Sequence, residues 1–295
     1  MIRKLKVFVP AHITGFFEII SNENPLLMGS RGAGIALDEG VFTEIVLKDG
    51  SGNIRINLNQ KSSCLNSISI RAVNIIKERY NLDLNNYDII INHETKLPIS
   101  SGFGTSAGFA LGVSFTLPKL FDINITFDEA GEIAHLSELS ESTGLGDVIS
   151  EMYGGCVIRL KEGSPSNAKI NKLLISKPIY VITKTLSSIN TSDIIKNPDH
   201  IKRINNGGHK LLGDLLKNPN VKNFIMLSRI FATQTKLISP ELNEILEIMD
   251  EETIGSSMAM LGNTAFALSY TPDISIENCL ITKINNSGIK YEKII

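Results

Sequence analysis

The sequence predicts a globular protein that combines helices with strands, organised as one large domain or two medium-sized ones. Its 295 residues are 42% hydrophobic and 20% charged, a composition that is typical of folded proteins and excludes disordered, collagen-like and coiled-coil chains. At ~150 residues per domain, this length corresponds to one or two domains. Strand-type apolar runs and segments with helical spacing both occur along the chain.

Charge and cysteine content exclude several classes of function. The net charge is -2 and no basic patch or tail is present, so we expect no nucleic-acid partner. The three cysteines, Cys64, Cys156 and Cys279, are isolated and form no C-x-x-C pair. Neither a disulfide framework nor a zinc site is predicted, and a reducing compartment fits this pattern.

The apolar start of the chain resembles a signal peptide only briefly. Pro10, His12 and Glu18 interrupt it, and no small-x-small cleavage site follows. The chain has no run of ~20 apolar residues that could span a membrane. We therefore expect a cytoplasmic protein without a membrane partner.

The first third of the chain predicts short strands, turns and one helix. Ile68, Ala72, Ile75 and Ile76 have near-helical spacing within residues 62–80. The other elements expected here are a strand over 5–9 that ends at Pro10, a turn and extended segment over 13–20, a glycine-rich loop over 25–34, strands over 35–37, 43–47 and 87–91, and a turn at 50–52.

The rest of the chain predicts more helix. A small-residue helix should follow a glycine-rich loop and run to about residue 120, and Asp128 should open the next helix. A polar Gly/Ser/Pro segment over 161–168 is the best linker candidate. The remaining elements expected are a short helix after 147 that ends at a Gly-Gly turn, strands over 156–160 and 179–183, helices over 194–217, 221–236 and 240–250, a turn at 255–257, a loop and strand within 258–270, and an ambiguous apolar segment over 276–284.

The loop that precedes the small-residue helix has the features of a phosphate site. Gly102 and Gly104 allow the backbone to turn sharply and approach a ligand. The free N–H groups and the positive dipole end of the following helix attract anions. Many strand–glycine loop–helix connections share this pattern without binding phosphate, so the loop alone leaves both interpretations open. It is not a P-loop, because no Gly-Lys-Ser/Thr follows.

The run PISSGFGTSA resembles the second motif of the GHMP small-molecule kinases, P-x-x-x-G-L-G-S-S-A. Asp147, followed by Gly154 and Gly155, matches the spacing of the Asp loop in the mevalonate-kinase branch, although Thr-Gly-Leu-Gly replaces Pro-Ser-Gly-x before the Asp. The first family motif, Pro-Gly-Lys/Arg, corresponds here to Pro10-Ala-His12. The third motif is only weakly matched by residues 255–264. The resemblance covers about residues 7 to 268.

Within this family, the combined segments are most similar to the archaeal pantoate kinases. These segments are PAHITGFFE, GSRGAG, TGLGD and MLGNT. The resemblance implies an α+β, two-domain GHMP kinase fold. Residues 1–165 would form an N-terminal, ribosomal S5 domain 2-like part with the ATP-binding loop. Residues 166–295 would form a C-terminal, ferredoxin-like layer, and the active site would lie between the two parts.

The resemblance also implies ATP and Mg²⁺ as cofactors, pantoate as the small-molecule substrate, and a possible homodimer. Mg²⁺ prefers oxygen ligands, and we expect Ser106 together with Glu138 to hold it, with Glu141 as the alternative carboxylate. The residues expected to bind the nucleotide are Pro98, Ser100, Ser101, Gly102, Phe103, Gly104, Thr105, Ser106 and Ala107.

Asp147 is expected to take the proton of the acceptor hydroxyl or to orient that hydroxyl. His12 occupies the position of a basic family residue and would donate to the acceptor oxygen or the moving phosphoryl group. Each has a structural alternative, because an Asp often caps a helix and a lone His is often a structural hydrogen bonder. Glu138 could equally lie on a solvated helix face.

Arg31 is expected to bind the substrate carboxylate, because a guanidinium offers a planar pair of donors. A surface arginine in a turn is the structural alternative. Thr14, Ser30 and Gly146 complete the expected substrate contacts. The rival functions are another GHMP kinase, acting on mevalonate, homoserine or shikimate, and a catalytically silent sensor on the same fold.

Overall fold

The computed structural model describes residues 2–62, 67–141, 144–188 and 198–292, which form an eight-stranded and a four-stranded sheet. Cys64 and Thr143, both part of the sequence predictions, lie outside the described residues. In the large sheet, β12, β1, β2, β5, β3 and β4 are adjacent in that order, and β6 pairs with β2 and β7. Its strands are β1 (Ile2–Ile20), β2 (Gly29–Asp49), β3 (Ile54–Leu58), β4 (Lys61–Ser62), β5 (Tyr87–Glu94), β6 (Cys156–Lys161), β7 (Lys169–Leu173) and β12 (Lys290–Tyr291).

The long antiparallel pair β1 and β2 differs from the short strands that the sequence predicts. β1 continues through Pro10 with register shifts at Pro10/His12 and Thr14/Phe16, so the prediction that it ends at Pro10 is wrong. β-Bulges of this kind absorb a residue that cannot join the regular ladder. Most of the predicted 25–34 loop also belongs to β2. Gly32 (φ +147°) lies so close to β1 that a Cβ there would overlap the Phe16 carbonyl.

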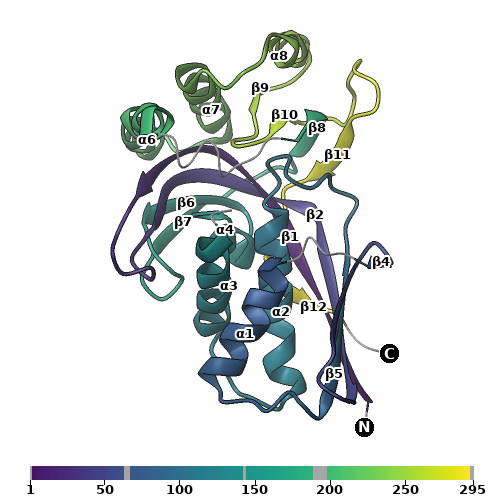
Figure 1. Ribbon diagram of the computed structural model, residues 1–295. Helices are drawn as coiled ribbons and strands as arrows, with labels where there is room; N and C mark the ends of the chain where they lie inside the picture. The colour runs from purple at the N-terminus through teal and green to yellow at the C-terminus, as the bar shows by residue number, and fades with distance from the viewer. Residues whose placement is uncertain (1, 63–66, 142–143, 189–197, 293–295) are drawn as a thin grey trace.

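The helices of the N-terminal half pack on one face of the large sheet (Figure 1). α2 is buried along nearly its whole length, as its apolar and small residues predict. It contacts β1 and β2 on one side and α1 and α3 on the other. These helices are α1 (Ser67–Arg79), α2 (Thr105–Leu120), α3 (Phe127–Glu141) and α4 (Asp147–Tyr153).

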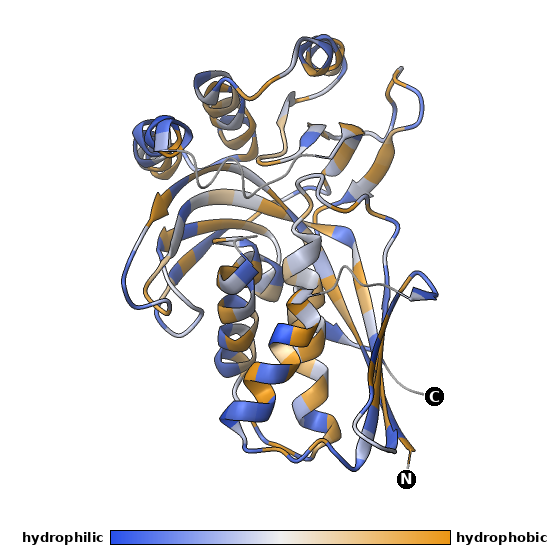
Figure 2. Ribbon diagram, viewed as in Figure 1, coloured by the Kyte–Doolittle hydropathy of each residue, from blue (hydrophilic) through white to orange (hydrophobic). Residues whose placement is uncertain are grey.

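The second, four-stranded sheet has the order β11, β8, β10 and β9. α7 and α8 lie beside it in Figure 1, whereas α6 packs against α7 and β1. Hydrophilic residues cover much of α6 in Figure 2. These elements are β8 (Tyr180–Ser187), α6 (Pro198–Lys217), α7 (Val221–Thr235), α8 (Pro240–Glu252), β9 (Gly255–Met258), β10 (Asn263–Ser269) and β11 (Leu280–Lys283).

Two predictions for the second half of the sequence are wrong. Residues 255–257 belong to β9, which pairs with β10, and do not form a turn. The 161–168 segment is no linker: it joins the antiparallel strands β6 and β7. Ser164 is fully buried and its N–H donates to the Leu26 carbonyl.

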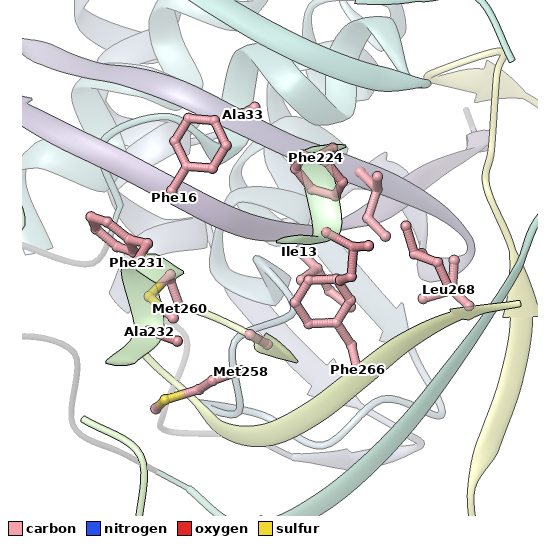
Figure 3. Close-up of a cluster of buried hydrophobic side chains, with 14 of the residues drawn as sticks. Ile13, Phe16, Ala33, Phe224, Phe231, Ala232, Met258, Met260, Phe266 and Leu268 are labelled. Carbon is pink, nitrogen blue, oxygen red and sulfur yellow. The ribbon is translucent and has the colours of Figure 1, made fainter. Parts of the chain in front are cut away.

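One hydrophobic cluster connects the two sheets (Figure 3). Phe16 of β1 lies 6.3 Å, between ring centroids, from Phe224 of α7, and Phe17 of β1 packs against Phe231 at 5.7 Å. Met258 and Met260 are buried in the same cluster. β1 therefore contributes side chains to the core of both halves of the molecule.

The division at residues 165 and 166 stays a prediction. β7 and β12 follow that point in the chain and belong to the large sheet. None of the helices in the described part of the chain is long and apolar enough to cross a membrane.

Candidate active site

The glycine-rich loop lies between β5 and α2 and leaves the start of α2 open. Ser100, Gly102 and Gly104 all have left-handed backbone angles, with φ of 58°, 87° and 66°. Gly104 is the N-cap of α2 and no side chain caps the helix there. The first N–H groups of α2 are therefore available to an anion, as the sequence predicts.

A cleft of about 280 Å³ opens beside this loop. Thr14, Ser30, Gly146 and Asp147 of the sequence prediction line it, together with the loop from Ser100 to Ser106. Leu58, Ile68, Ile99 and Phe109 give one part of the cleft an apolar lining. The structure thus brings together most of the predicted nucleotide and substrate residues, although they come from distant parts of the chain.

Asp147 begins α4 and points its carboxylate at His12. The His12 Nδ1 donates to Asp147 Oδ1 across 2.7 Å, and the histidine is fully buried while the aspartate side chain is 24% exposed. Burial lowers the pKa of His12, although the hydrogen bond and charge of Asp147 oppose this. Burial acts to raise the pKa of Asp147, but its hydrogen bonds with His12 and Thr14 and the charge of Arg159 lower it overall.

A neutral histidine therefore holds an ionised aspartate in place. His12 is not itself among the residues that line the cleft, although it contacts Asp147, which is, and a Cβ on Gly34 would overlap its Nε2. The structure places His12 as a support for Asp147, whereas the sequence predicts a donor to the acceptor oxygen or phosphoryl group. That predicted role is not tested.

Two carboxylates from different elements meet at Gly144. A Cβ on this glycine would overlap Glu138 Oε2 and would lie 3.5 Å from Asp147 Oδ2. Glu138 of α3 is 1% exposed, so it does not lie on a solvated helix face. The alternative, Glu141, is exposed, lines the cleft and accepts a hydrogen bond from Ser67 Oγ at 2.6 Å.

Arg159 of β6 is a cleft residue that the sequence analysis missed. It is 2% exposed, and its Nη1 donates to Ser150 Oγ at 3.0 Å. Burial lowers its pKa to about 10, and Asp147 acts in the opposite direction. The pKa remains far above neutral pH, so Arg159 is a buried cation beside Asp147. Its only signal in the sequence is a basic residue within the apolar run Cys156–Leu160.

Gly146 allows Ser30 and Arg159 to approach the same point of the cleft. A Cβ on Gly146 would overlap Ser30 Oγ and lie 2.6 Å from Arg159 Nε. Arg31, by contrast, is not among the residues that line this cleft. Its Nε lies 2.9 Å from Glu18 Oε1 and 3.5 Å from Glu162 Oε2.

The weakly matched third motif packs directly on the glycine-rich loop. Thr264 Oγ1 donates to the Ser101 carbonyl at 2.8 Å, and a Cβ on Gly262 would overlap that carbonyl. Leu261, which has a φ of +66°, lines the cleft with Met260. The C-terminal half therefore contributes to the site by supporting the loop.

Comparison with known proteins agrees with this geometry. Residues 67–155 match the family model described as GHMP kinases N terminal domain. A pantoate kinase from Methanocaldococcus jannaschii is 40% identical over 89% of this chain and 92% of its own length. The chain belongs to the GHMP kinases. A pantoate kinase from Thermococcus kodakarensis is 30% identical over 95% of this chain and 93% of its own length.

Solved structures show the same fold for this GHMP kinase. One titled as a phosphotransferase related to the CoA biosynthesis pathway superposes with a TM-score of 0.86 at 28% identity, covering 98% of this chain and 99% of the other. The Methanococcus jannaschii mevalonate kinase gives a TM-score of 0.69 at 18% identity, covering 97% and 98%. These matches confirm the predicted α+β, two-domain GHMP kinase fold.

Proposed function

We propose that this GHMP kinase transfers the γ-phosphoryl group of ATP to a hydroxyl of pantoate, giving 4-phosphopantoate and ADP. Three relatives that are 30–40% identical over 89–95% of this chain are named pantoate kinase. The structural observation that carries the proposal is the buried Arg159, which lies beside Asp147 in the cleft. It supplies a cation for the carboxylate of an acceptor whose hydroxyl faces Asp147.

Asp147 is the proposed proton acceptor. Its Oδ1 pairs with His12, and we assign Oδ2 to the acceptor hydroxyl. As the new oxygen–phosphorus bond forms, the bond between the γ-phosphorus and the β–γ bridging oxygen breaks, and ADP leaves with that electron pair. The hydroxyl proton passes to Asp147, which makes the oxygen a better nucleophile.

The nucleotide would lie along the glycine-rich loop. The first N–H groups of α2 face the phosphates, and Leu58, Ile68, Ile99 and Phe109 offer an apolar slot for the base. Phosphoryl transfer depends chiefly on positioning and on neutralising charge, so these contacts account for a large share of the chemistry.

Mg²⁺ fits the residues present. The buried carboxylate of Glu138 approaches Asp147 at Gly144, and Ser106 lines the cleft, so hard oxygen donors are available from both sides. We propose that Glu138 and Ser106 hold the ion. When bound, Mg²⁺ would neutralise phosphate charge during the transfer.

The pantoate carboxylate would bind at Arg159 and Ser30. Arginine matches a carboxylate with two parallel donors, and burial strengthens such charged hydrogen bonds. Gly146 keeps the space between the two side chains open. Arg31 remains a second candidate for this contact, because its exposed fraction of 29% leaves it accessible beside Glu18 and Glu162.

ADP release with a panel of acceptors tests the proposal. The purified protein, with ATP and Mg²⁺, is given pantoate, mevalonate, homoserine, shikimate or pantoyl lactone, and ADP is measured by a coupled assay. We expect turnover with pantoate and none with pantoyl lactone, whose ring ester ties up both the carboxylate and the 4-hydroxyl that would accept the phosphoryl group. Faster turnover with another acceptor would identify that compound, and not pantoate, as the substrate. No turnover with any acceptor would favour a catalytically silent sensor.

A further inference from the structure

Glu151 of α4 is a buried acid that the proposed chemistry does not use. The residue is 0% exposed, and neither carboxyl oxygen has a hydrogen-bond partner among the residues that the structure describes. Its side chain points at the first turn of α2. A Cβ on Gly104 would overlap Glu151 Oε1, and a Cβ on Gly108 would lie 3.7 Å from Oε2.

These contacts place the carboxyl group in a slot formed by two glycines at the start of the phosphate-binding helix. Gly104 is the N-cap of α2, and Gly108 N–H donates to its carbonyl as the first turn closes. The Glu151 side chain therefore fills the space beneath the point where the loop becomes a helix. Its removal would leave that backbone without support.

The charges around Glu151 disfavour its ionised form. Asp147 on the same helix and Glu138 on α3 are the charged groups that act on it, and both are acidic. Burial, followed by these two carboxylates, raises its pKa well above the ordinary value. Arg159 is hydrogen-bonded to Ser150 and acts on Asp147. The positive end of α2 favours a charge at Glu151, but burial without a hydrogen-bond partner is a larger effect.

We propose that Glu151 is a positioning residue for the phosphate-binding loop and that it performs this role as a neutral carboxylic acid. Neutrality matters because an ionised carboxylate at this point would add a third negative charge beside Asp147 and Glu138, next to the place where the phosphates bind. The inference rests on the proposed nucleotide site but is independent of the identity of the acceptor.

Infrared difference spectroscopy tests the protonation state. A buried neutral carboxylic acid has a C=O stretching band that an ionised carboxylate lacks. We expect this band in the spectrum of the unchanged protein minus that of Glu151→Gln at neutral pH. The control is Glu132→Gln, which makes the same change at a partly buried glutamate whose carboxylate is paired with Arg79, and it should remove no such band. Absence of the band for Glu151 would overturn the proposal.

Binding of an unreactive ATP analogue with Mg²⁺, measured by calorimetry, tests the positioning role. Glu151→Gln is neutral and of equal size, so its affinity should stay within about threefold of the unchanged protein, as should that of Glu132→Gln. Glu151→Asp and Glu151→Ala withdraw the side chain from the slot and should weaken binding by about tenfold or more. Thermal melting identifies any variant that fails to fold.

The outcomes separate the two proposals. If the unchanged protein does not bind the analogue, the proposed nucleotide site is wrong. If it binds and Glu151→Gln changes the affinity by more than about tenfold in either direction, Glu151 acts as a charged group and the inference fails. The inference also fails if the folded Asp and Ala variants both bind as tightly as the unchanged protein.

Discussion

Asp147 combines partial exposure with firm support from the protein. His12, Thr14 and Arg159 together keep its pKa low despite burial, so it is ionised at neutral pH. The 24% exposure of its side chain allows it to meet an acceptor in the cleft. A base with a low pKa accepts a proton only as transfer proceeds, which suits a reaction dominated by positioning.

Asp147→Asn should lower kcat by at least about a hundredfold and leave nucleotide affinity within about threefold. The substitution keeps the shape and the acceptor oxygen for His12 but removes the proton acceptor. Steady-state kinetics and titration with an ATP analogue measure the two effects. A variant that retains more than about a tenth of the original kcat would contradict a role as base.

Arg159→Lys should raise the KM for pantoate by about ten- to a hundredfold, since charged hydrogen bonds contribute ~1.5–3 kcal/mol. The ammonium group keeps a positive charge but lacks the paired donors. Arg31→Ala is the comparison, because Arg31 is not among the cleft-lining residues and pairs with Glu18 and Glu162. If the KM for pantoate rises in Arg31→Ala and not in Arg159→Lys, the substrate carboxylate binds at Arg31, as the sequence predicts.

The residues that could be predicted from sequence are those that belong to spaced motifs. The loop up to Ser106, and Asp147 with its Gly154–Gly155 pair, carry such motifs, and the structure brings the loop and Asp147 to one cleft. Arg159 carries no motif. Its role depends on β6 pairing with β2, and this long-range contact has no local signature in the sequence. Glu151 was missed for the same reason, because the slot that receives it is formed by another helix.

At the scale of elements, the site depends on two loops that pack against each other. The glycine-rich loop has three left-handed residues: Gly102 and Gly104 adopt this conformation readily, but Ser100, with a φ of 58°, costs backbone free energy unless neighbouring groups hold it. Thr264 and Gly262 of the C-terminal half provide that support through the Ser101 carbonyl. The weak third motif therefore has a structural role even though most of its family glycines are missing.

Gly262→Ala should raise the KM for ATP and lower the free energy of unfolding by ~1–3 kcal/mol, since its Cβ would overlap the Ser101 carbonyl. Gly213→Ala in α6 is the matched control, because a Cβ there meets nothing within 4 Å. It should stabilise the helix by ~0.5–1 kcal/mol and leave the KM unchanged. Denaturant unfolding gives the free energy of unfolding of both variants, and steady-state kinetics gives their KM for ATP. If Gly262→Ala has the same KM for ATP and the same stability as Gly213→Ala, the two loops are not coupled.

The elements were predictable where their pattern is local. The helices over 105–120 and 221–235 follow their apolar spacing closely. β1 and β2 were predicted as fragments, because Pro10 and the glycines of residues 29–34 normally end strands. Pairing along nearly the whole length of the two strands, with bulges at the irregular points, outweighs those local preferences.

At the scale of the whole molecule, a buried histidine connects the large sheet with its helices. Hydroxyl groups of Thr43 on β2 and Ser69 on α1 each lie 2.9 Å from a ring nitrogen of His93. Phe109 of α2 lies against the ring, with centroids 4.7 Å apart. Burial lowers the pKa of His93 to about 3, so the ring is neutral in the folded protein.

The neutral state of His93 predicts a loss of stability in acid. Below the unfolded pKa of about 6.5, the unfolded chain binds a proton at this histidine that the folded protein does not. Each further pH unit of acidification therefore lowers the free energy of unfolding by ~1.4 kcal/mol, until the folded pKa is reached. His12, whose pKa is also lowered by burial, adds to this slope. His93→Gln should reduce the slope of unfolding free energy against pH between about 6 and 4 by one proton.

His209→Gln is the control for this measurement, because the His209 side chain is 75% exposed. Its slope should stay close to that of the unchanged protein. Urea unfolding at several pH values gives the three slopes. An unchanged slope for His93→Gln would show that His93 does not contribute the predicted proton.

The predicted homodimer is a separate question, which light scattering can answer.

The identity of the reaction product tests the central claim most directly. The purified protein is incubated with ATP, Mg²⁺ and pantoate, and the products are analysed by mass spectrometry and by ³¹P nuclear magnetic resonance. The account predicts that each ADP formed is matched by one pantoate carrying one phosphoryl group on its 4-hydroxyl, and that Asp147→Asn forms almost none. ADP formation without phosphorylated pantoate, or a phosphoryl group on the carboxylate, would contradict the account.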